Sequence, residues 1–530
     1  MRRLLLLLLV WESVAVSAAD NKTRLVVGIT VSQFYPEWLS VYGDELKEGG
    51  LKRLMREGVS PVADYGYFYS QTGVDEATIY TGMLPSSHGI IAHDWYERLQ
   101  KTRENNVGSA EYKEIGAPDM TKGYAPANMQ ALTLGCILKM NNTFSKVYSV
   151  GMNPEETILS GGTCADMALW FDERGGKWVS SEYYADSLPG WLKRYNEKIE
   201  SDFFIRRGWM PLAEEQSNTL ALKLKSKVGL NNSFFYDIAQ AKRKFNTYKV
   251  LKATPYANTM VVDLVEPLLS ETGLGKDNDV DLLALNFQCL DYMNRDFGVY
   301  AKEFQDVLMR LDNDVERLLE LLDRKVGKEN YTVFMTFTEA RELLPEELGK
   351  MRVQGGYFSI FKAVALLKSY LGLVYGPGDW VIDYDAGQLY LNRELIESRK
   401  ISLKEVQDKV ADFLIEFEGV SKVITAYSLT HNAFSSGQEL LMQNSFSQKR
   451  SGDVMFSLQP AWIPELKDRE DSYFRYSKRH KVPVYFYGAG VKTSYMKECR
   501  MTDILPTICR IAGVPVPYSA GGMNIFNQAF

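Results

Sequence analysis

The residues from Val26 to Phe34 read VVGITVSQF, and this stretch decides the fold. Its apolar, mostly β-branched part, from Leu25 to Val31, predicts a short strand that is buried in a sheet. Polar Ser32 and Gln33 follow at once. Because ligands of an open α/β sheet bind outside the carboxyl ends of its strands, these two residues are the first candidates for a site.

Similar apolar runs recur along the chain and alternate with segments of helical spacing. Strands are predicted over residues 146–150, 281–287, 331–336 and 482–487, and helices over 46–56, 129–138, 304–322 and 502–511. Strands that alternate with helices predict a largely parallel sheet covered by helices on both faces. We therefore expect an α/β fold built around one central sheet.

The ends of the predicted strands nominate further candidates for the site. These are Asn153 and Glu155 after 146–150, the segment Asp291–Arg295 after 281–287, and Thr338 and Glu339 after 331–336. Thr72 joins them because residues 73–81 are predicted to form a helix, and a helix N-terminus favours an anion. A Thr at that place is also most often just an N-cap.

Two stretches interrupt the alternation of strands and helices. Residues 181–258 are rich in aromatic and charged residues, and we interpret them as an insertion that caps the crevice of the site. Residues 387–450 begin with a strand, a helix and a strand, which predicts a small α/β insert.

The N-terminus has the layout of a secretory signal peptide. Arg2 and Arg3 precede an apolar run over residues 4–10, and small residues follow up to Ala19. This pattern predicts cleavage near Ala19, a mature domain over residues 20–530, and a periplasmic or secreted protein. The apolar run is too short for a stable anchor, and we expect no transmembrane segment elsewhere.

Composition narrows the classes of partner. The chain has 530 residues and a net charge of −6, and no stripe of Lys and Arg follows one face, so we expect no nucleic-acid partner. The five Cys are widely spaced and form neither a zinc knuckle nor a redox pair. Their pairing stays open, and most of them are expected to be small buried apolar residues.

Several blocks carry a resemblance to a known family. They are VVGITVSQF (26–34), EGGLKRLMREG (48–58), QTGVDEATIYTGMLPSSHGIIAHDWYE (71–97), SKVYSVGMNPEETILSGG (145–162), LLALNFQCLDYMNRDFG (282–298), VPVYFYGAG (482–490) and MTDILPTICRIAGV (501–514). Together they resemble the alkaline phosphatase superfamily, in its type I phosphodiesterase and nucleotide pyrophosphatase branch, and above all periplasmic bacterial alkaline phosphatases with a threonine nucleophile. The resemblance implies a three-layer α/β sandwich with a mostly parallel central sheet.

The resemblance also implies a particular chemistry. Such enzymes hold two zinc ions with three Asp and three His, and zinc prefers nitrogen and anionic oxygen ligands. Paired metals clamp the attacking and leaving oxygens of the reaction. An Asn, a Lys and an Arg donate hydrogen bonds to the transferred phosphoryl group and offset its charge.

This sequence departs from that pattern at most of its positions. Thr72 keeps the nucleophile position and Asp291 is the one metal ligand retained. Ser32, Arg295, Thr338 and Glu339 stand at former ligand positions, and His93, Asn153 and Glu155 stand at those of the Asn, Lys and Arg. The last His ligand has no clear counterpart between residues 468 and 477.

Histidine and arginine chemistry point the same way. The chain has four His, of which we interpret His88 and His480 as structural and only His93 as new to the site. A guanidinium cannot ligate zinc and would repel it. Arg295 is therefore expected either to join an ion-pair network with nearby acids or to hold a phosphate or sulfate group. A third interpretation is a rebuilt metal site that uses Asp75, Glu76, Asp291, Glu339 and His93, which would suit zinc or another divalent metal.

Three functions follow as hypotheses. The first is a degenerate phosphatase without a metal cofactor that serves as a binding or scaffolding protein in the cell envelope. Its partner would be an envelope protein or a ligand that carries phosphate or sulfate. The second is an active hydrolase of phosphate esters with Thr72 as nucleophile and a rebuilt metal site. The third is a glycan-binding protein that uses the aromatic-rich insertion.

Overall fold

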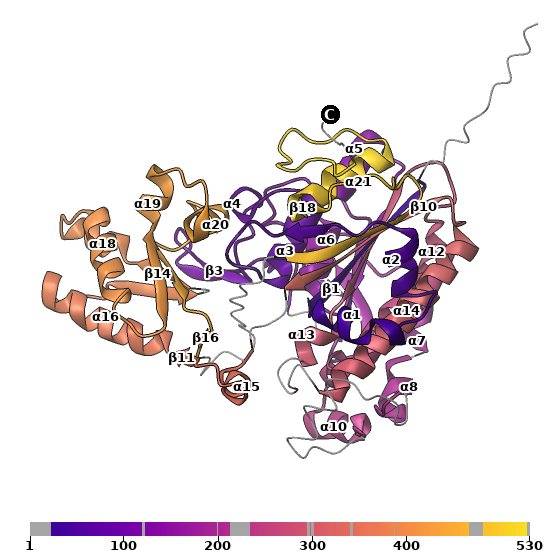
Figure 1. The fold of residues 1–530 in the computed structure, drawn as a ribbon, viewed down its shortest axis with the longest axis horizontal. Coiled ribbons are helices and arrows are strands. Elements are labelled where there is room, and N and C mark those ends of the chain that lie inside the picture. Colours follow the sequence, from indigo (N-terminus) through magenta and orange to yellow (C-terminus); the bar gives the residue numbers. More distant parts are fainter. Residues whose placement is uncertain are drawn as a thin grey trace, which may run out of the picture.

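The computed structural model describes residues 23–118, 122–198, 200–212, 234–293, 297, 301–339, 343–385, 387–465 and 481–526. Within them the chain forms a large lobe around a ten-stranded sheet and a smaller lobe around a four-stranded sheet (Figure 1). The predicted signal peptide, Arg295 and His480 lie outside the described residues. No helix in the described part of the chain is long and apolar enough to cross a membrane.

The central sheet has the order β18-β2-β17-β10-β1-β9-β6-β7-β8-β5. The strands are β1 (Leu25–Phe34), β2 (Val62–Asp64), β5 (Glu114–Ile115), β6 (Val147–Gly151), β7 (Met167–Asp172), β8 (Lys177–Ser181), β9 (Asp281–Phe287), β10 (Tyr331–Glu339), β17 (Lys481–Gly488) and β18 (Glu498–Arg500). The five central strands, from β10 to β7, are parallel, and β17 and β8 pair antiparallel at their two sides. The predicted largely parallel sheet is confirmed.

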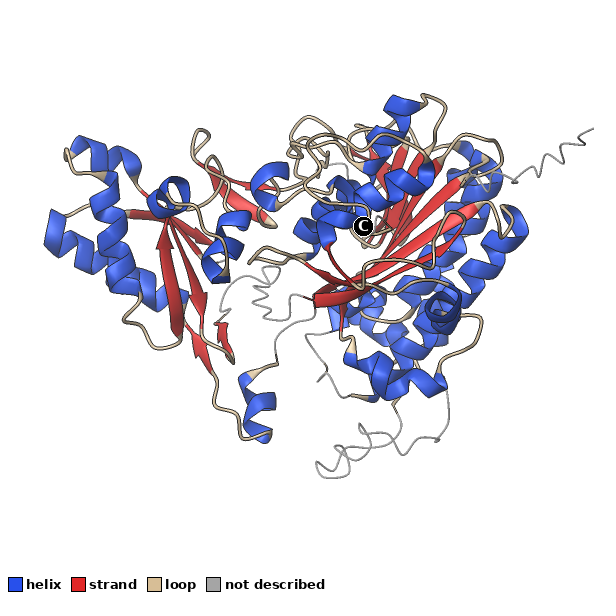
Figure 2. Ribbon diagram, turned by 45° about the horizontal axis from the view of Figure 1, so that its top comes forward, coloured by secondary structure: helices blue, strands red, loops and turns tan. Residues whose placement is uncertain are grey.

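Helices cover both faces of the sheet, as Figure 2 shows. One layer contains α3 (Thr72–Thr81), α6 (Pro154–Gly161) and α21 (Ile504–Ala512), and the other contains α2 (Leu51–Glu57), α12 (Tyr256–Thr272) and α14 (Lys302–Lys325). All ten residues of β1 are buried between these layers, which explains why its sequence is apolar without alternation. The three-layer α/β sandwich predicted from the sequence is the observed architecture.

The smaller lobe has its own hydrophobic core. Its sheet has the order β12-β13-β15-β14 and all its pairs are antiparallel. The elements are β12 (Val381–Asp385), β13 (Gln388–Leu391), β14 (Val420–Thr425) and β15 (Val454–Leu458), with α16 (Ile360–Tyr375), α17 (Arg393–Ser398), α18 (Leu403–Leu414), α19 (Ala426–His431) and α20 (Gly437–Ser445). The predicted strand, helix and strand at 387–426 correspond to β13, α18 and β14. The lobe also includes α16 and β12, which precede the predicted bounds of 387–450.

A hairpin connects the two lobes. It consists of β3 (Asp94–Glu97) and β4 (Thr102–Asn105), and it lies between the lobes in Figure 1. Arg103 pairs with Asp383 of the smaller lobe at 2.8 Å, and the ring of Tyr96 lies 5.9 Å from that of Tyr390. The hairpin therefore ties the residues near the candidate site to the smaller lobe.

The segment predicted as a cap is helical where it is described. It contains α7 (Gly190–Glu197), α8 (Glu200–Arg207), α10 (Ile238–Phe245) and α11 (Lys249–Lys252). The loop after α8 contacts α14, because Trp209 Nε1 donates a hydrogen bond to Asp306 Oδ2 at 2.7 Å. Tyr236, just before α10, also contacts α14 and donates to Glu303 at 2.9 Å. The cap over residues 181–258 stays a prediction.

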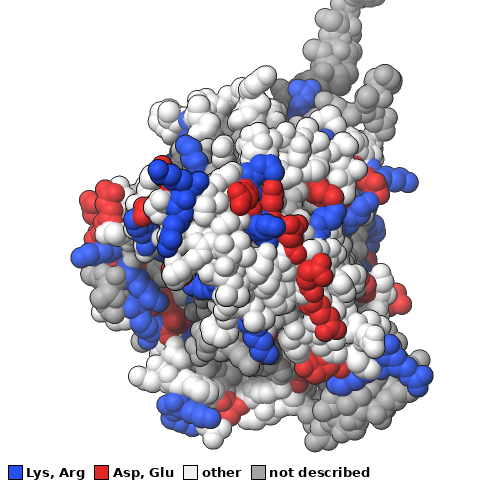
Figure 3. All heavy atoms as spheres, turned by 90° about the vertical axis from the view of Figure 1, so that its left-hand side faces the viewer, with Lys and Arg blue, Asp and Glu red and all other residues white. Residues whose placement is uncertain are grey.

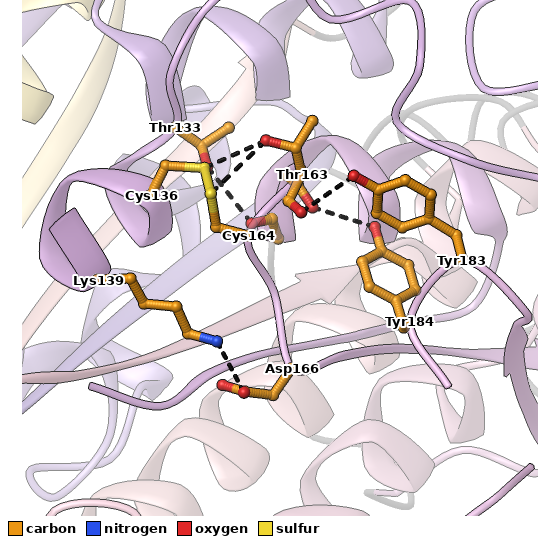
Figure 4. The surroundings of a disulfide bond; sticks show 10 residues. Thr133, Cys136, Lys139, Thr163, Cys164, Asp166, Tyr183 and Tyr184 are labelled. Atoms are coloured by element: carbon orange, nitrogen blue, oxygen red, sulfur yellow. Dashed lines mark hydrogen bonds and ion pairs between the residues drawn. A yellow bond between two sulfur atoms is a disulfide. The ribbon is translucent and has the colours of Figure 1, made fainter. Parts of the chain in front are cut away.

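Two of the five cysteines form a disulfide. Cys136, near the start of α5 (Leu134–Asn141), is bonded to Cys164 in the loop after α6. Figure 4 shows this disulfide with Thr133, Thr163 and Tyr183 around it. The spacing of the cysteines in the sequence does not indicate this pair. The other three cysteines, Cys289, Cys499 and Cys509, are buried, as expected for small apolar residues.

The outer face of the smaller lobe carries charges of both signs. Figure 3 shows Lys and Arg beside Asp and Glu, with uncharged surface between them. Among the described residues on this face, Lys and Arg do not form an extended positive patch. Such a patch is the feature by which a protein attracts the phosphates of nucleic acid.

Candidate active site

Thr72 and Asp291 meet at the carboxyl end of the central sheet. Thr72 is the first residue of α3, and Asp291 lies in the short helix α13 (Cys289–Met293) that follows β9. The hydroxyl of Thr72 donates to Asp291 Oδ1 at 3.4 Å. The N-cap interpretation of Thr72 is wrong, because Gln71 occupies the N-cap position. The Thr72 hydroxyl is instead turned toward the aspartate.

Gln33, one of the first candidates from the sequence, contacts Asp291 through its side-chain amide. Its Nε2 donates to Asp291 Oδ1 at 2.5 Å, closer than the Thr72 hydroxyl, and its backbone N–H donates to Thr338 Oγ1 at 3.0 Å. Gln33 has φ +53°, and the pairing of β1 with β10 shifts register between Val31 and Phe34. A left-handed conformation is uncommon outside glycine. It aims the amide at Asp291, which the strand pattern alone does not reveal.

Two positions that the resemblance suggests for metal ligands hold neutral hydroxyl groups. Ser32 and Thr338 are both buried at the ends of adjacent strands, β1 and β10. Neither hydroxyl carries the negative charge that a zinc ligand provides. Glu339 ends β10 beside them, and its side chain lies outside the described residues. The floor of the site at these two strand ends is thus polar.

Glu155 and His93 form the second half of the site. His93 Nδ1 lies 2.6 Å from Glu155 Oε2, and Asn106 Nδ2 donates to Glu155 Oε1 at 2.5 Å. Gly73, the residue after Thr72, makes this arrangement possible, since a Cβ on it would lie 2.1 Å from Glu155 Oε1. The Glu155 carboxylate is therefore packed against the N-terminus of α3. Asn106 follows the β3–β4 hairpin, and no pattern in the sequence marked it.

The charge of Glu155 dominates the chemistry of His93. The carboxylate raises the pKa of His93 to about 10, although burial acts in the opposite direction. Gln71 fixes the backbone of His93 through its side-chain oxygen, which accepts from the His93 N–H at 2.6 Å. The ring is therefore an imidazolium at neutral pH and neutralises Glu155.

Asn153 caps the N-terminus of α6. Its side-chain oxygen accepts from the Glu156 N–H at 3.4 Å, with Pro154 at the first helical position. Asn with Pro in this order is a typical helix start. The same turn is held by Gln288, whose Oε1 accepts from the Met152 N–H at 2.5 Å. The Asn153 side-chain oxygen is thus bonded to the α6 backbone.

Two acids of the hypothetical rebuilt metal site bind protein groups. Asp75 accepts hydrogen bonds from Tyr67 at 2.6 Å and Ser70 at 2.7 Å. Glu76 is fully buried and accepts from Asn286 Nδ2 at 3.0 Å, and burial raises its pKa well above the ordinary value. The rebuilt metal site that combines these acids with Asp291, Glu339 and His93 stays a prediction.

The remaining described histidines are structural. His88 is fully buried, with Nε2 3.0 Å from Thr78 Oγ1 and Nδ1 accepting from the Ile90 N–H at 3.1 Å. Burial lowers the pKa of His88 to about 3. His431 stacks on Tyr427 at the end of α19. The structural interpretation of His88 is confirmed.

The donor set around Asp291 does not fit a pair of zinc ions. One Asp291 oxygen already accepts from an amide and a hydroxyl, and the nearby carboxyl groups of Asp75 and Glu76 are bonded to Tyr67, Ser70 and Asn286. Among the side chains that the structure describes, no group of three or more His, Cys, Asp and Glu could hold a metal ion. Arg295 and the Glu339 side chain lie outside that set, so their predicted roles stay predictions.

Comparison with known proteins places the chain among relatives of nearly full length. A model of the type I phosphodiesterase / nucleotide pyrophosphatase family matches residues 26–482. A protein of Myroides odoratus named calcium-transporting ATPase is 30% identical over 95% of each chain. Alkaline phosphatase PafA of Elizabethkingia meningoseptica is 25% identical over 96% of this chain and 94% of the relative. The crystal structure of wild-type alkaline phosphatase PafA has a TM-score of 0.86 at 24% identity, over 95% of this chain and 98% of that one.

The fold and the position of the site define the class of protein. A mostly parallel sheet between helical layers, matched over its length by an alkaline phosphatase, is the architecture of the alkaline phosphatase superfamily. Within it, the chain belongs to the type I phosphodiesterase / nucleotide pyrophosphatase family.

Proposed function

We propose that this protein is an exported, degenerate phosphatase that binds or scaffolds a partner in the cell envelope instead of hydrolysing phosphate esters. The observation that carries the proposal is Glu155, whose carboxylate packs against Gly73 beside Thr72. A phosphoryl group brings negative charge and needs donors around it. A partly buried carboxylate at this place repels such a group, and the paired His93 only neutralises it.

The surroundings of Asp291 support the same proposal. The Gln33 amide and the Thr72 hydroxyl both donate to Asp291 Oδ1, so this oxygen is already engaged by neutral donors. A Thr hydroxyl without a metal or a base to lower its pKa is a poor nucleophile. In this proposal the hydrogen bond from Thr72 to Asp291 does not activate the hydroxyl as a nucleophile.

Export is part of the proposal. The N-terminal pattern over residues 1–19 is that of a signal peptide. The Cys136–Cys164 disulfide supports a destination outside the reducing cytosol, where such bonds persist. The partner would be an envelope protein or a ligand with a phosphate or sulfate group that Arg295 could hold.

Metal content is the decisive measurement. Protein purified without chelators should contain less than about a tenth of a zinc ion per chain by mass spectrometry, because the described donors do not suit zinc. An active alkaline phosphatase prepared in parallel is the control, and it should retain its metal. One or two tightly bound metal ions per chain would refute the proposal.

A second candidate function is hydrolysis of phosphate esters with zinc or another divalent metal. Two observations favour it: Thr72 faces Asp291 at 3.4 Å, and several full-length relatives are named alkaline phosphatases. It predicts hydrolysis of aryl phosphate monoesters or diesters after addition of zinc, magnesium, manganese or calcium. That activity must disappear in Thr72→Ala. Background rates with all four metals would eliminate this candidate.

A further inference from the structure

A groove lies at the opposite end of the central sheet from Thr72. It has a volume of about 370 Å³ and lies where β6 and β9 begin, whereas the Thr72 site lies where they end. The seven residues of β9 alone separate the two places by roughly 20 Å, at about 3.3 Å per residue. The groove is therefore distinct from the candidate active site. Its size is typical of a site for a small ligand.

Two helices end at this groove and shape it. They are α5, which ends at Asn141, and α21, which ends at Ala512 and is capped by Gly513 with φ +70°. Figure 1 shows α5 and α21 beside each other near the C-terminus. The C-terminus of a helix carries partial negative charge on its unpaired carbonyl groups. Two such ends favour a ligand that donates hydrogen bonds and disfavour an anion.

The polar lining consists mainly of amides. Asn142 Nδ2 donates to Asp279 Oδ1 at 2.5 Å, which fixes the carboxylate in the groove wall. Asn141 and Asn278 are exposed, and within the described part of the chain neither side chain has a hydrogen-bond partner. Ser145 adds a hydroxyl from the same turn as Asn142. An amide both donates and accepts, so this lining matches ligand groups that also do both.

Apolar groups complete the groove. Val280, Ile511 and Val514 form part of its wall. Phe144 and Met140, which flank the lining asparagines in sequence, are 77% and 72% exposed.

The nearby charges exclude other classes of ligand. Lys146 pairs with Asp277 at 2.8 Å, and Lys139 pairs with Asp166 at 2.7 Å, so neither ammonium group is available to an anion. Asp279 is the one charged residue in the lining, and one of its oxygens is already bonded to Asn142. A ligand with many hydroxyl groups and no net charge suits this balance better than a phosphate or a strongly basic peptide.

We propose that this groove binds a neutral saccharide unit, with Asn141, Asn278, Ser145 and Asp279 on its hydroxyl groups and Val280, Ile511 and Val514 against its C–H groups. The site differs from the aromatic-rich insertion at 181–258, which the sequence had nominated for glycans. The proposal is independent of whether the Thr72 site is active, because the two sites occupy opposite ends of the sheet.

Isothermal titration calorimetry on the whole mature protein tests the proposal. The probes are neutral trisaccharides (cellotriose, maltotriose, chitotriose and mannotriose), a sulfated disaccharide and a lysine-rich peptide. At least one neutral trisaccharide should bind, and Asn141→Leu combined with Asn278→Leu should weaken its binding at least tenfold. Both changes are at exposed positions, and circular dichroism should confirm that the variants are folded.

Asn432→Leu is the matched control. Asn432 is likewise an exposed asparagine at a helix end, but it caps α19 in the smaller lobe. Binding should be unchanged in this variant. The proposal is overturned if no neutral trisaccharide binds, if binding survives the groove substitutions, or if the sulfated disaccharide or the peptide binds more tightly than every neutral probe.

Discussion

Replacing Glu155 by glutamine should return the pKa of His93 to nearly its ordinary value of 6.5. In the native protein, the carboxylate 2.6 Å from Nδ1 raises this pKa to about 10. The full change would correspond to about 1.36 kcal/mol per pKa unit. The His93 side chain is 41% exposed, so solvent screens the pair, and we expect a contribution to stability of about 1–2 kcal/mol.

The sign of the pH dependence follows from the direction of the shift. The folded-state pKa of His93 is raised above its unfolded value, so the stabilisation is fully present below about pH 6.5 and is lost as pH rises through about 10. The free energy of unfolding of the native protein should therefore exceed that of Glu155→Gln by about 1–2 kcal/mol at pH 6. The difference should shrink toward zero by about pH 10.5.

Two assays measure this prediction. Nuclear magnetic resonance can follow the ring signals, since the chain has only four His. Urea unfolding at both pH values gives the stability difference. The His431 ring, which stacks on Tyr427 in the smaller lobe, is the internal control, and its signals should not change with the substitution. A native His93 that titrates near pH 6.5, or a stability difference that is equal at both pH values, would refute the reasoning.

Three further predictions concern single contacts. Gly73→Ala should displace the Glu155 carboxylate, because the new Cβ would lie 2.1 Å from its Oε1, and the histidine titration should then resemble that of Glu155→Gln. An unchanged titration would show that the helix start yields instead. Cys136→Ser with Cys164→Ser opens a loop of sequence separation 28 and should lower the free energy of unfolding by ~3–4 kcal/mol, measured in urea; a loss below about 1 kcal/mol would contradict this estimate. Glu76→Gln should gain stability relative to the native protein as pH rises above the ordinary Glu range, because burial raises the pKa of the Glu76 carboxyl group while glutamine does not titrate. The opposite trend in urea unfolding would show that Glu76 is charged in the folded protein.

The strands were the most predictable part of the fold. Residues 281–287 were predicted as a strand and form β9 with the same bounds, because a buried parallel strand is continuously apolar. The helix predicted over 46–56 begins only at Leu51 in the structure. The reason is tertiary: Gly49 and Gly50 lie against Glu316 and Asp312 of α14, and that contact leaves no trace in the local pattern.

The site was predictable only as far as strand ends determine position. The approach of Thr72 to Asp291 followed from the rule for open α/β sheets. The roles of Gln33 and Asn106 did not, because the first depends on one left-handed residue and the second on a loop after a hairpin. The capping role of Asn153 was readable from the Asn-Pro order, but the family resemblance drew attention to phosphate chemistry instead.

The separate hydrophobic core of the smaller lobe has a consequence for how the protein melts. That core consists almost wholly of residues between Phe358 and Leu458, and it shares only Phe68 and Tyr69 with the first part of the chain. Because the two hydrophobic cores are separate clusters, each lobe should unfold as its own cooperative unit. Calorimetry should therefore resolve two transitions. A bound ligand raises the midpoint of the unit that holds it. The transition whose midpoint rises when a ligand is added therefore identifies the lobe that binds it.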